Sequence, residues 1–198
     1  MRAVMASVPP EILEWRKRTG ADRFDEMWEG VLHMVAAPNR EHQDFRWSLE
    51  TFLRLRWSRC QQFKVYSEVN VAPAGDWPRN YRIPDLILLT PERYHIDRNE
   101  FFEGAPEVVV EIRSPDDESY EKLAFYAALG VPECWIIERD SKHPEVFRLA
   151  EGTYLPQPAT ENGWVPSLAT DLEMRAEGSG KFLIRESNRP DSQNSLPY

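Results

Sequence analysis

Two nearly uninterrupted apolar runs constrain the fold of this chain more than any other feature. Residues 83–90 read IPDLILLT, and residues 106–112 read PEVVVEI. Short apolar runs bounded by proline and turn-forming residues are typical of strands that are covered on both faces of a sheet. Residues 133–138 (ECWIIE) form a third run of this kind. The chain therefore needs a central sheet with a layer on each side.

Helical patterns alternate with these strands and can supply the two layers. We expect helices over residues 9–18, 39–58 and 114–130, a hairpin over 24–35, strands over 63–71 and 145–149, and short strands within 152–184. This order predicts an α/β (mixed α+β) fold with a central mixed sheet flanked by helices. We expect a single domain over residues 1–185 and a flexible C-terminal tail over 186–198.

Composition limits the class of protein. The 198 residues are 41% hydrophobic, which is ordinary for a globular protein with a real core. No stretch approaches the roughly 18 consecutive apolar residues of a membrane span, and the N-terminus lacks the pattern of a signal peptide. The two cysteines, Cys60 and Cys134, form no motif. These features predict a cytoplasmic protein with no membrane partner.

The net charge of −9 opposes binding to nucleic acid, because lysine and arginine supply most of that affinity. Positive charge must then be concentrated locally or come from metal ions. The sequence has two modest basic clusters, Arg54, Arg56, Arg59 and Lys64 in one and Arg79 and Arg82 in the other. Each cluster is either a phosphate-binding track or an ordinary solvated surface.

Lys122 lies in an unusual place on the helix expected over residues 114–130. At 100° per residue, Phe125 and Leu129 fall within about 60° of it on one side, and Tyr126 falls about 40° away on the other. Lys122 is therefore inside the apolar arc. Because a lysine is almost never fully buried without a partner, we expect an anionic group beside it.

Two carboxylates are candidates for that partner. Asp85 begins one apolar run and Glu111 ends the other. If these strands pair antiparallel, both side chains lie at the same end of the sheet, where the helix with Lys122 also starts. Two carboxylates and a lysine at one point indicate a metal site for phosphodiester hydrolysis.

Each of these residues also has a purely structural interpretation. Asp85 follows a proline and could cap a turn. Lys122 could form an exposed pair with Glu118, one helical turn earlier. Glu111 follows three valines, so a structural role for it would need a buried partner.

Two further residues are possible accessory members of the site. Glu68 lies on the polar face of its expected strand, so it is either solvated or a third acidic contributor. His42 lies on the apolar face of its helix, so it is either a core histidine or a site residue.

The strings IPDLILL, EVVVEIRSP and EKLAFYAALGVPECWIIE, preceded by FDEMWEGVLHMVAAPNREHQ, resemble the Uma-type (Uma2/DUF820) "putative restriction endonuclease" family. This family is a branch of the PD-(D/E)XK nuclease superfamily, and the resemblance covers about residues 24–149. It implies a restriction-endonuclease-like core and a divalent cation, Mg²⁺ or Mn²⁺, held by Asp85 and Glu111. The superfamily's lysine commonly lies two residues after the glutamate, where this chain has Arg113. The family's lysine comes from the following helix, which matches Lys122.

The resemblance also implies roles and partners. Lys122 would orient water or stabilise developing charge. Arg113 cannot act as a base because it stays protonated, but it could clamp a phosphate. DNA is the expected substrate, and a homodimer is possible by analogy with other nucleases of this fold.

Three functions remain open from the sequence. The leading interpretation is a metal-dependent DNA endonuclease. The first alternative is a catalytically inactive nucleic-acid or protein interaction module on the same fold, which the acidic charge favours and the retention of all three polar site residues disfavours. The second is an unrelated hydrolase that uses the same carboxylate-bound metal.

Overall fold

The computed structural model describes residues 3–5, 8–35, 37–57, 62–178 and 180–197. The helices are α1 (Pro10–Thr19), α2 (Arg40–Trp57), the 3₁₀ helix η1 (Pro91–Ile96) and α3 (Leu123–Leu129). The strands before α3 are β1 (Ala3–Met5), β2 (Glu26–Trp28), β3 (Val31–Met34), β4 (Lys64–Ser67), β5 (Val71–Ala72), β6 (Leu86–Leu89), β7 (Phe102–Glu103) and β8 (Val108–Arg113). Those after it are β9 (Glu133–Glu138), β10 (Pro144–Ala150), β11 (Thr153–Pro156), β12 (Val165–Pro166), β13 (Leu172–Glu177), β14 (Lys181–Glu186) and β15 (Arg189–Leu196).

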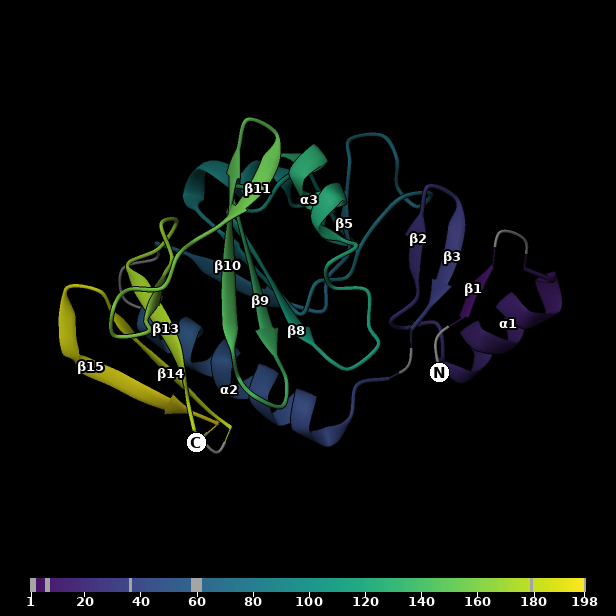
Figure 1. Cartoon of the computed structure of the whole chain (residues 1–198). Coiled ribbons are helices and arrows are strands. Elements are labelled where there is room, and N and C mark those ends of the chain that lie inside the picture. The colour runs from purple at the N-terminus through teal and green to yellow at the C-terminus, as the bar shows by residue number, and fades with distance from the viewer. Residues whose placement is uncertain (1–2, 6–7, 36, 58–61, 179, 198) are drawn as a thin grey trace.

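The three apolar runs form the middle of a six-stranded sheet with the order β11-β10-β9-β8-β6-β4. β8 and β9 are parallel and the other neighbours antiparallel, so the predicted mixed sheet is confirmed. Side chains alternate along β8: Val108, Val110 and Ile112 pack with α2 and the C-terminal sheet, whereas Val109 packs with α3. Helices α2 and α3 accordingly lie on opposite sides of the sheet (Figure 1).

The N-terminal part of the chain forms a small sheet with the order β1-β3-β2, beside which α1 lies (Figure 1). The predicted hairpin is confirmed, and its turn places Glu29 and Gly30 at positive φ, 50° and 88°. Met27 bridges to Tyr81 in an antiparallel pair. This contact holds β2 beside the segment that leads into β6, which is where the candidate site begins.

The prediction of a helix over residues 114–130 is wrong for the first half of that range, because α3 begins only at Leu123. Asp117 accepts hydrogen bonds from the backbone N–H of Ser114 at 2.6 Å and from the backbone N–H and the hydroxyl of Ser119 at 3.0 and 2.8 Å. Asp116 has a φ of 63°, outside the helical region. Aspartate-centred turns therefore replace the expected first helical turns.

The expected flexible tail is also different in the structure. Arg189–Leu196 is β15, which pairs antiparallel with β14 and completes a four-stranded sheet with the order β12-β13-β14-β15. Leu196 is fully buried against the core. A single apolar residue in a polar stretch is too weak a signal to predict such a strand. The single-domain organisation of residues 1–185 stays a prediction.

Candidate functional site

Asp85 and Glu111 lie opposite each other at one end of the central sheet. β6 and β8 pair antiparallel with Leu86 opposite Val110, so the next pair outward is Asp85 and Glu111. The backbone N–H of Ile112 donates to Asp85 Oδ2 at 2.6 Å. The pairing predicted from the two apolar runs is confirmed.

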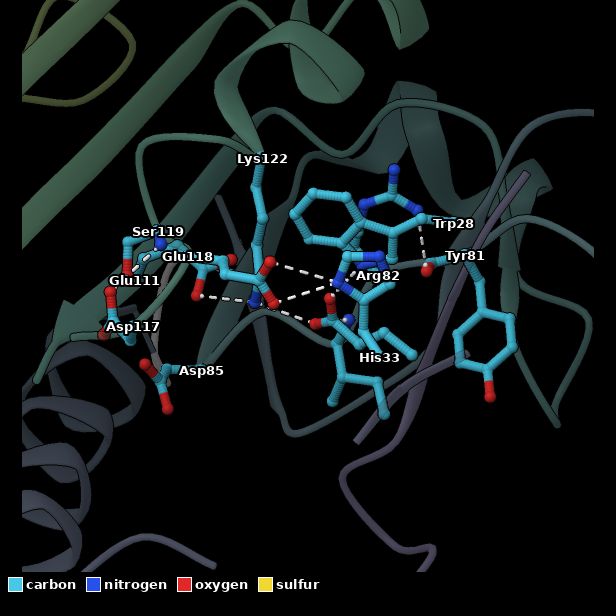
Figure 2. A network of polar contacts seen from close by, with 12 residues as sticks. Trp28, His33, Tyr81, Arg82, Asp85, Glu111, Asp117, Glu118, Ser119 and Lys122 are labelled. Carbon is cyan, nitrogen blue, oxygen red and sulfur yellow. Dashed lines mark hydrogen bonds and ion pairs between the residues drawn. The ribbon is translucent and has the colours of Figure 1, made fainter. Parts of the chain in front are cut away.

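Lys122 points toward these carboxylates from the start of α3 (Figure 2). Its Nζ lies 3.2 Å from Glu111 Oε2 and 2.8 Å from Glu26 Oε1. The three side chains are 11%, 4% and 2% exposed, so this is a buried cluster of charges. The expectation of an anionic partner is confirmed, and the interpretation of Lys122 and Glu118 as an exposed pair is wrong because Glu118 is itself buried.

Sequence reasoning missed Glu26, which comes from β2. Its Oε1 also accepts the backbone N–H of Ile83 at 2.8 Å, and its Oε2 accepts the indole N–H of Trp28 at 2.8 Å. The available signal was the alternation in the hairpin, because Phe24, Glu26 and Trp28 fall on one face. A glutamate between two aromatic residues on that face indicates a buried carboxylate.

Tyr126 was missed as well. It lies one helical turn after Lys122, is fully buried, and donates its hydroxyl to Glu111 Oε1 at 2.6 Å. Lys122 and Tyr126 thus bind the two oxygens of Glu111 separately. This arrangement fixes the orientation of the carboxylate.

Burial determines the acid–base behaviour of the cluster. It raises the pKa of Glu111 to about 8; the charge of Lys122 opposes this rise, and those of Asp85 and Glu26 add to it. Burial would lower the pKa of Lys122, but Glu111 and Glu26 raise it above its ordinary value, so the ammonium stays protonated. One lysine among three carboxylates leaves the cluster short of positive charge.

These residues line a cleft of about 500 Å³. Seven carboxylates and two permanent cations line it among the described residues: Glu26, Glu68, Asp85, Glu111, Asp116, Asp117 and Glu118, with Lys122 and Arg139. Such a surface repels a polyanion unless cations enter it.

Both accessory candidates reach the cleft. His42 Nε2 lies 3.2 Å from Asp85 Oδ1. Burial by itself lowers the pKa of His42. The hydrogen bond and the negative charge of Asp85, together with the backbone of Ile112, raise the pKa by more than burial lowers it, so the pKa of His42 is above its ordinary value. Glu68 is held by Gln43 at 3.1 Å and by Arg23 at 3.0 Å. His42 therefore contacts Asp85 directly, whereas the carboxylate of Glu68 contacts Gln43 and Arg23.

Among the predicted site residues, Arg113 does not line this cleft. Its guanidinium pairs with Glu138 at 2.5 Å and lies 5.1 Å from the ring centre of Tyr120. Glu111 therefore lines the cleft, whereas the side chain of Arg113 lies outside it beside Glu138.

Four of the six side chains in the two predicted basic clusters contact other side chains of the protein. Arg82 is buried, with its guanidinium 4.1 Å from the ring centres of both Trp28 and Phe125. Arg54 pairs with Glu50, Arg56 pairs with Asp171 and Glu186, and Lys64 lies over the ring of Tyr94. Arg59 lies outside the described residues.

A second buried pair holds the N-terminal hairpin against the segment before α3. His33 Nδ1 lies 2.9 Å from Glu118 Oε2, and the His33 ring stacks on Trp28 with a centroid distance of 4.1 Å. Figure 2 shows this pair beside the Lys122 cluster. The hairpin that supplies Glu26 and the segment that supplies Lys122 are thus fixed to each other.

The donor set at Asp85 and Glu111 fits a hard divalent cation. Mg²⁺ prefers oxygen ligands, keeps several waters, and needs only one or two carboxylates together with a substrate phosphate. No group of three or more His, Cys, Asp or Glu side chains is arranged to hold a metal in the part of the chain that the structure describes. The residues therefore suit a weakly held, largely hydrated ion.

Comparison with known proteins bears on the fold and the family of the chain. In the described part of the chain, no helix is long and apolar enough to cross a membrane. No curated protein matches the chain. The crystal structure of a "putative nuclease belonging to DUF820" from Anabaena variabilis ATCC 29413 matches with a TM-score of 0.59 and 17% identity, covering 72% of this chain and 80% of that one.

At this identity the likeness shows a shared fold, which is restriction-endonuclease-like. The model of the family described as "Uma2: Putative restriction endonuclease" matches residues 9–177. This match spans most of the sequence, and the chain therefore belongs to the Uma2 family.

Proposed function

We propose that this protein is a metal-dependent endonuclease that hydrolyses phosphodiester bonds in DNA. The observation that supports this most is the meeting of Asp85, Glu111 and Lys122 in one cleft. Membership of a family described as restriction endonucleases supports nucleic acid as the substrate class.

The protein's own residues would divide the work as follows. Mg²⁺ or Mn²⁺ bound by Asp85 and Glu111 would polarise the phosphoryl group and favour ionisation of water. His42 and Tyr126 hold the two carboxylates in position. Lys122 stays protonated and can orient the attacking water or stabilise charge that develops on the phosphate.

The test is cleavage of plasmid DNA, single-stranded DNA and RNA with Mg²⁺, Mn²⁺ or a chelator. We expect Asp85→Asn, Glu111→Gln and Lys122→Met each to reduce cleavage by about 100-fold or more. Glu177→Gln and Lys181→Met make the same charge changes at exposed positions in the C-terminal sheet and should cleave normally. Equal cleavage by wild type and all three cleft variants would refute the proposal.

The alternative is an inactive interaction module on the same fold, and the acidic cleft is the observation that favours it. Nucleic-acid binding without cleavage under any metal condition would support that alternative. A homodimer, which would let two sites cut two strands, is also part of the proposal, and light scattering in solution tests it.

A further inference from the structure

The charge of the cleft leaves the binding of a substrate phosphate unexplained. Lys122 is the residue expected to meet a phosphate, but its ammonium is already shared between Glu26 and Glu111. Arg113, the other expected contact, does not line this cleft. The second permanent cation among the described lining residues is Arg139.

We propose that Arg139 binds a phosphate of the nucleic-acid substrate and so positions the strand beside Asp85 and Glu111. The proposal rests on the proposed function and names a substrate-contact residue for it. It moves the phosphate clamp expected of Arg113 to the residue that directly follows the neighbouring strand, β9.

The backbone places Arg139 at the end of the sheet where the carboxylates lie. It follows β9 directly, and β9 runs parallel to β8, with Glu111 opposite Ile136. The backbone N–H of Arg139 donates to the carbonyl of Arg113 at 2.9 Å, so the sheet pairing continues to this residue. Arg139 therefore lies at the same end of the sheet as Glu111, one strand away.

The side chain is positioned before any ligand binds. It is only 16% exposed, and its Nη1 lies 3.5 Å from the hydroxyl of Ser114, which also lines the cleft. Fixing a long, flexible arginine in the free protein reduces the entropy lost when it binds a ligand.

The present partner of Arg139 can be replaced at little cost. The carboxylate of Asp140 accepts hydrogen bonds from Nε of Arg139 at 2.7 Å and from Nη2 of Arg139 at 3.2 Å. Asp140 is, however, 60% exposed. An ion pair with one exposed partner contributes little to stability. The same two donors match two oxygens of a phosphate, which a lysine ammonium cannot do in a fixed plane.

The test measures DNA affinity in a Lys122→Met background, which retains both carboxylates. A fluorescent duplex is titrated with protein in Mg²⁺ across about 50 to 200 mM salt. We expect Arg139→Gln to weaken binding about tenfold or more and to lower the salt slope by roughly one phosphate contact. Arg139→Lys should recover part of the affinity, because it restores charge without the two-pronged geometry. Arg148→Gln, at an exposed position of β10, is the matched control and should change neither quantity.

A merely structural role for Arg139 would appear in stability instead. The melting temperature of Arg139→Gln should lie within about 4 °C of its parent, because only an exposed pair is lost. If Arg139→Gln and Arg148→Gln bind with the same affinity and salt slope, the inference is wrong and the proposed function stands. If the parent binds neither DNA nor RNA at any salt or metal concentration, the proposed function and the inference both fail.

Discussion

Glu111 is the residue on which the rest of the cluster depends. It is buried, faces Asp85 across the strand pair, and has each oxygen bound by a different side chain of the segment around α3. Its surroundings favour the protonated form, while the proposed metal needs the carboxylate. The residue therefore couples protonation, stability and metal binding.

This coupling predicts an unusual dependence of stability on pH. The pKa of Glu111 is about 8 in the folded protein and 4.5 in the reference state, so between these values the native state holds more protons than the unfolded state. The contribution of protonated Glu111 to the free energy of unfolding is complete below about pH 4.5 and is lost as the pH rises through 8. In chelator, the free energy of unfolding of wild type should fall relative to Glu111→Gln between pH 5 and 8, by on the order of a few kcal/mol.

Urea denaturation at a series of pH values checks this prediction. The difference between wild type and Glu111→Gln matters, because other titrating groups contribute equally to both proteins. Parallel pH profiles would mean that Glu111 is ionised normally in the folded state.

Glu26 should act through Lys122. With Glu26→Gln, the Lys122 ammonium depends on Glu111 alone and competes with a cation for that carboxylate. We expect Mg²⁺ affinity to fall by about tenfold although both proposed ligands remain. Calorimetric titration measures this. Glu107→Gln, which breaks the pair with Arg93, is the control. An unchanged affinity in Glu26→Gln would show that Lys122 does not compete with the ion.

At the scale of elements, sequence reasoning succeeded where the signal is local. β6, β8 and β9 are apolar runs, and a single antiparallel pairing was enough to bring Asp85 and Glu111 together. Sequence reasoning failed where a contact depends on parts of the chain that are distant in sequence. The partner of Glu26 is Lys122, which directly precedes α3 far along the sequence, and no local pattern joins the two.

The start of α3 shows a different limit. Ser-Pro-Asp-Asp is suitable both for the first turn of a helix and for aspartate-centred turns. The buried contact between His33 and Glu118 joins this segment to the N-terminal hairpin, and such a tertiary contact cannot be read from local sequence. This tertiary contact and the local hydrogen bonds of Asp117 both favour the turns.

The turn segment over residues 114–122 should therefore depend on Asp117. Asp117→Ala removes the acceptor for three hydrogen bonds and should lower the free energy of unfolding by about 1–3 kcal/mol. It should also increase hydrogen exchange at the amide of Lys122, because the segment that positions it is loosened. Asp116→Asn is the control, since asparagine tolerates the positive φ there. Equal stability of the two variants would show that packing, and not Asp117, maintains the turns.

At the scale of the whole molecule, the net charge of −9 and the seven carboxylates of the cleft have the same consequence. Self-repulsion opposes the folded state, and a polyanionic substrate adds to it. A divalent cation at Asp85 and Glu111 would relieve both effects. Cation binding and substrate binding should therefore be linked, with metal required for tight association with DNA.

Millimolar Mg²⁺ or Mn²⁺ should accordingly raise the melting temperature of the wild type by mass action, because the ion binds the folded state alone. Asp85→Asn and Glu111→Gln should lose this shift, and Glu111→Gln should already be more stable than wild type in chelator at pH 8, since it removes a buried negative charge. Sodium chloride at matched ionic strength separates specific binding from screening. Equal shifts in all three proteins would put the ion elsewhere. The absence of any shift in the wild type would mean that Lys122 alone balances these carboxylates, and the metal-dependent mechanism would have to be abandoned.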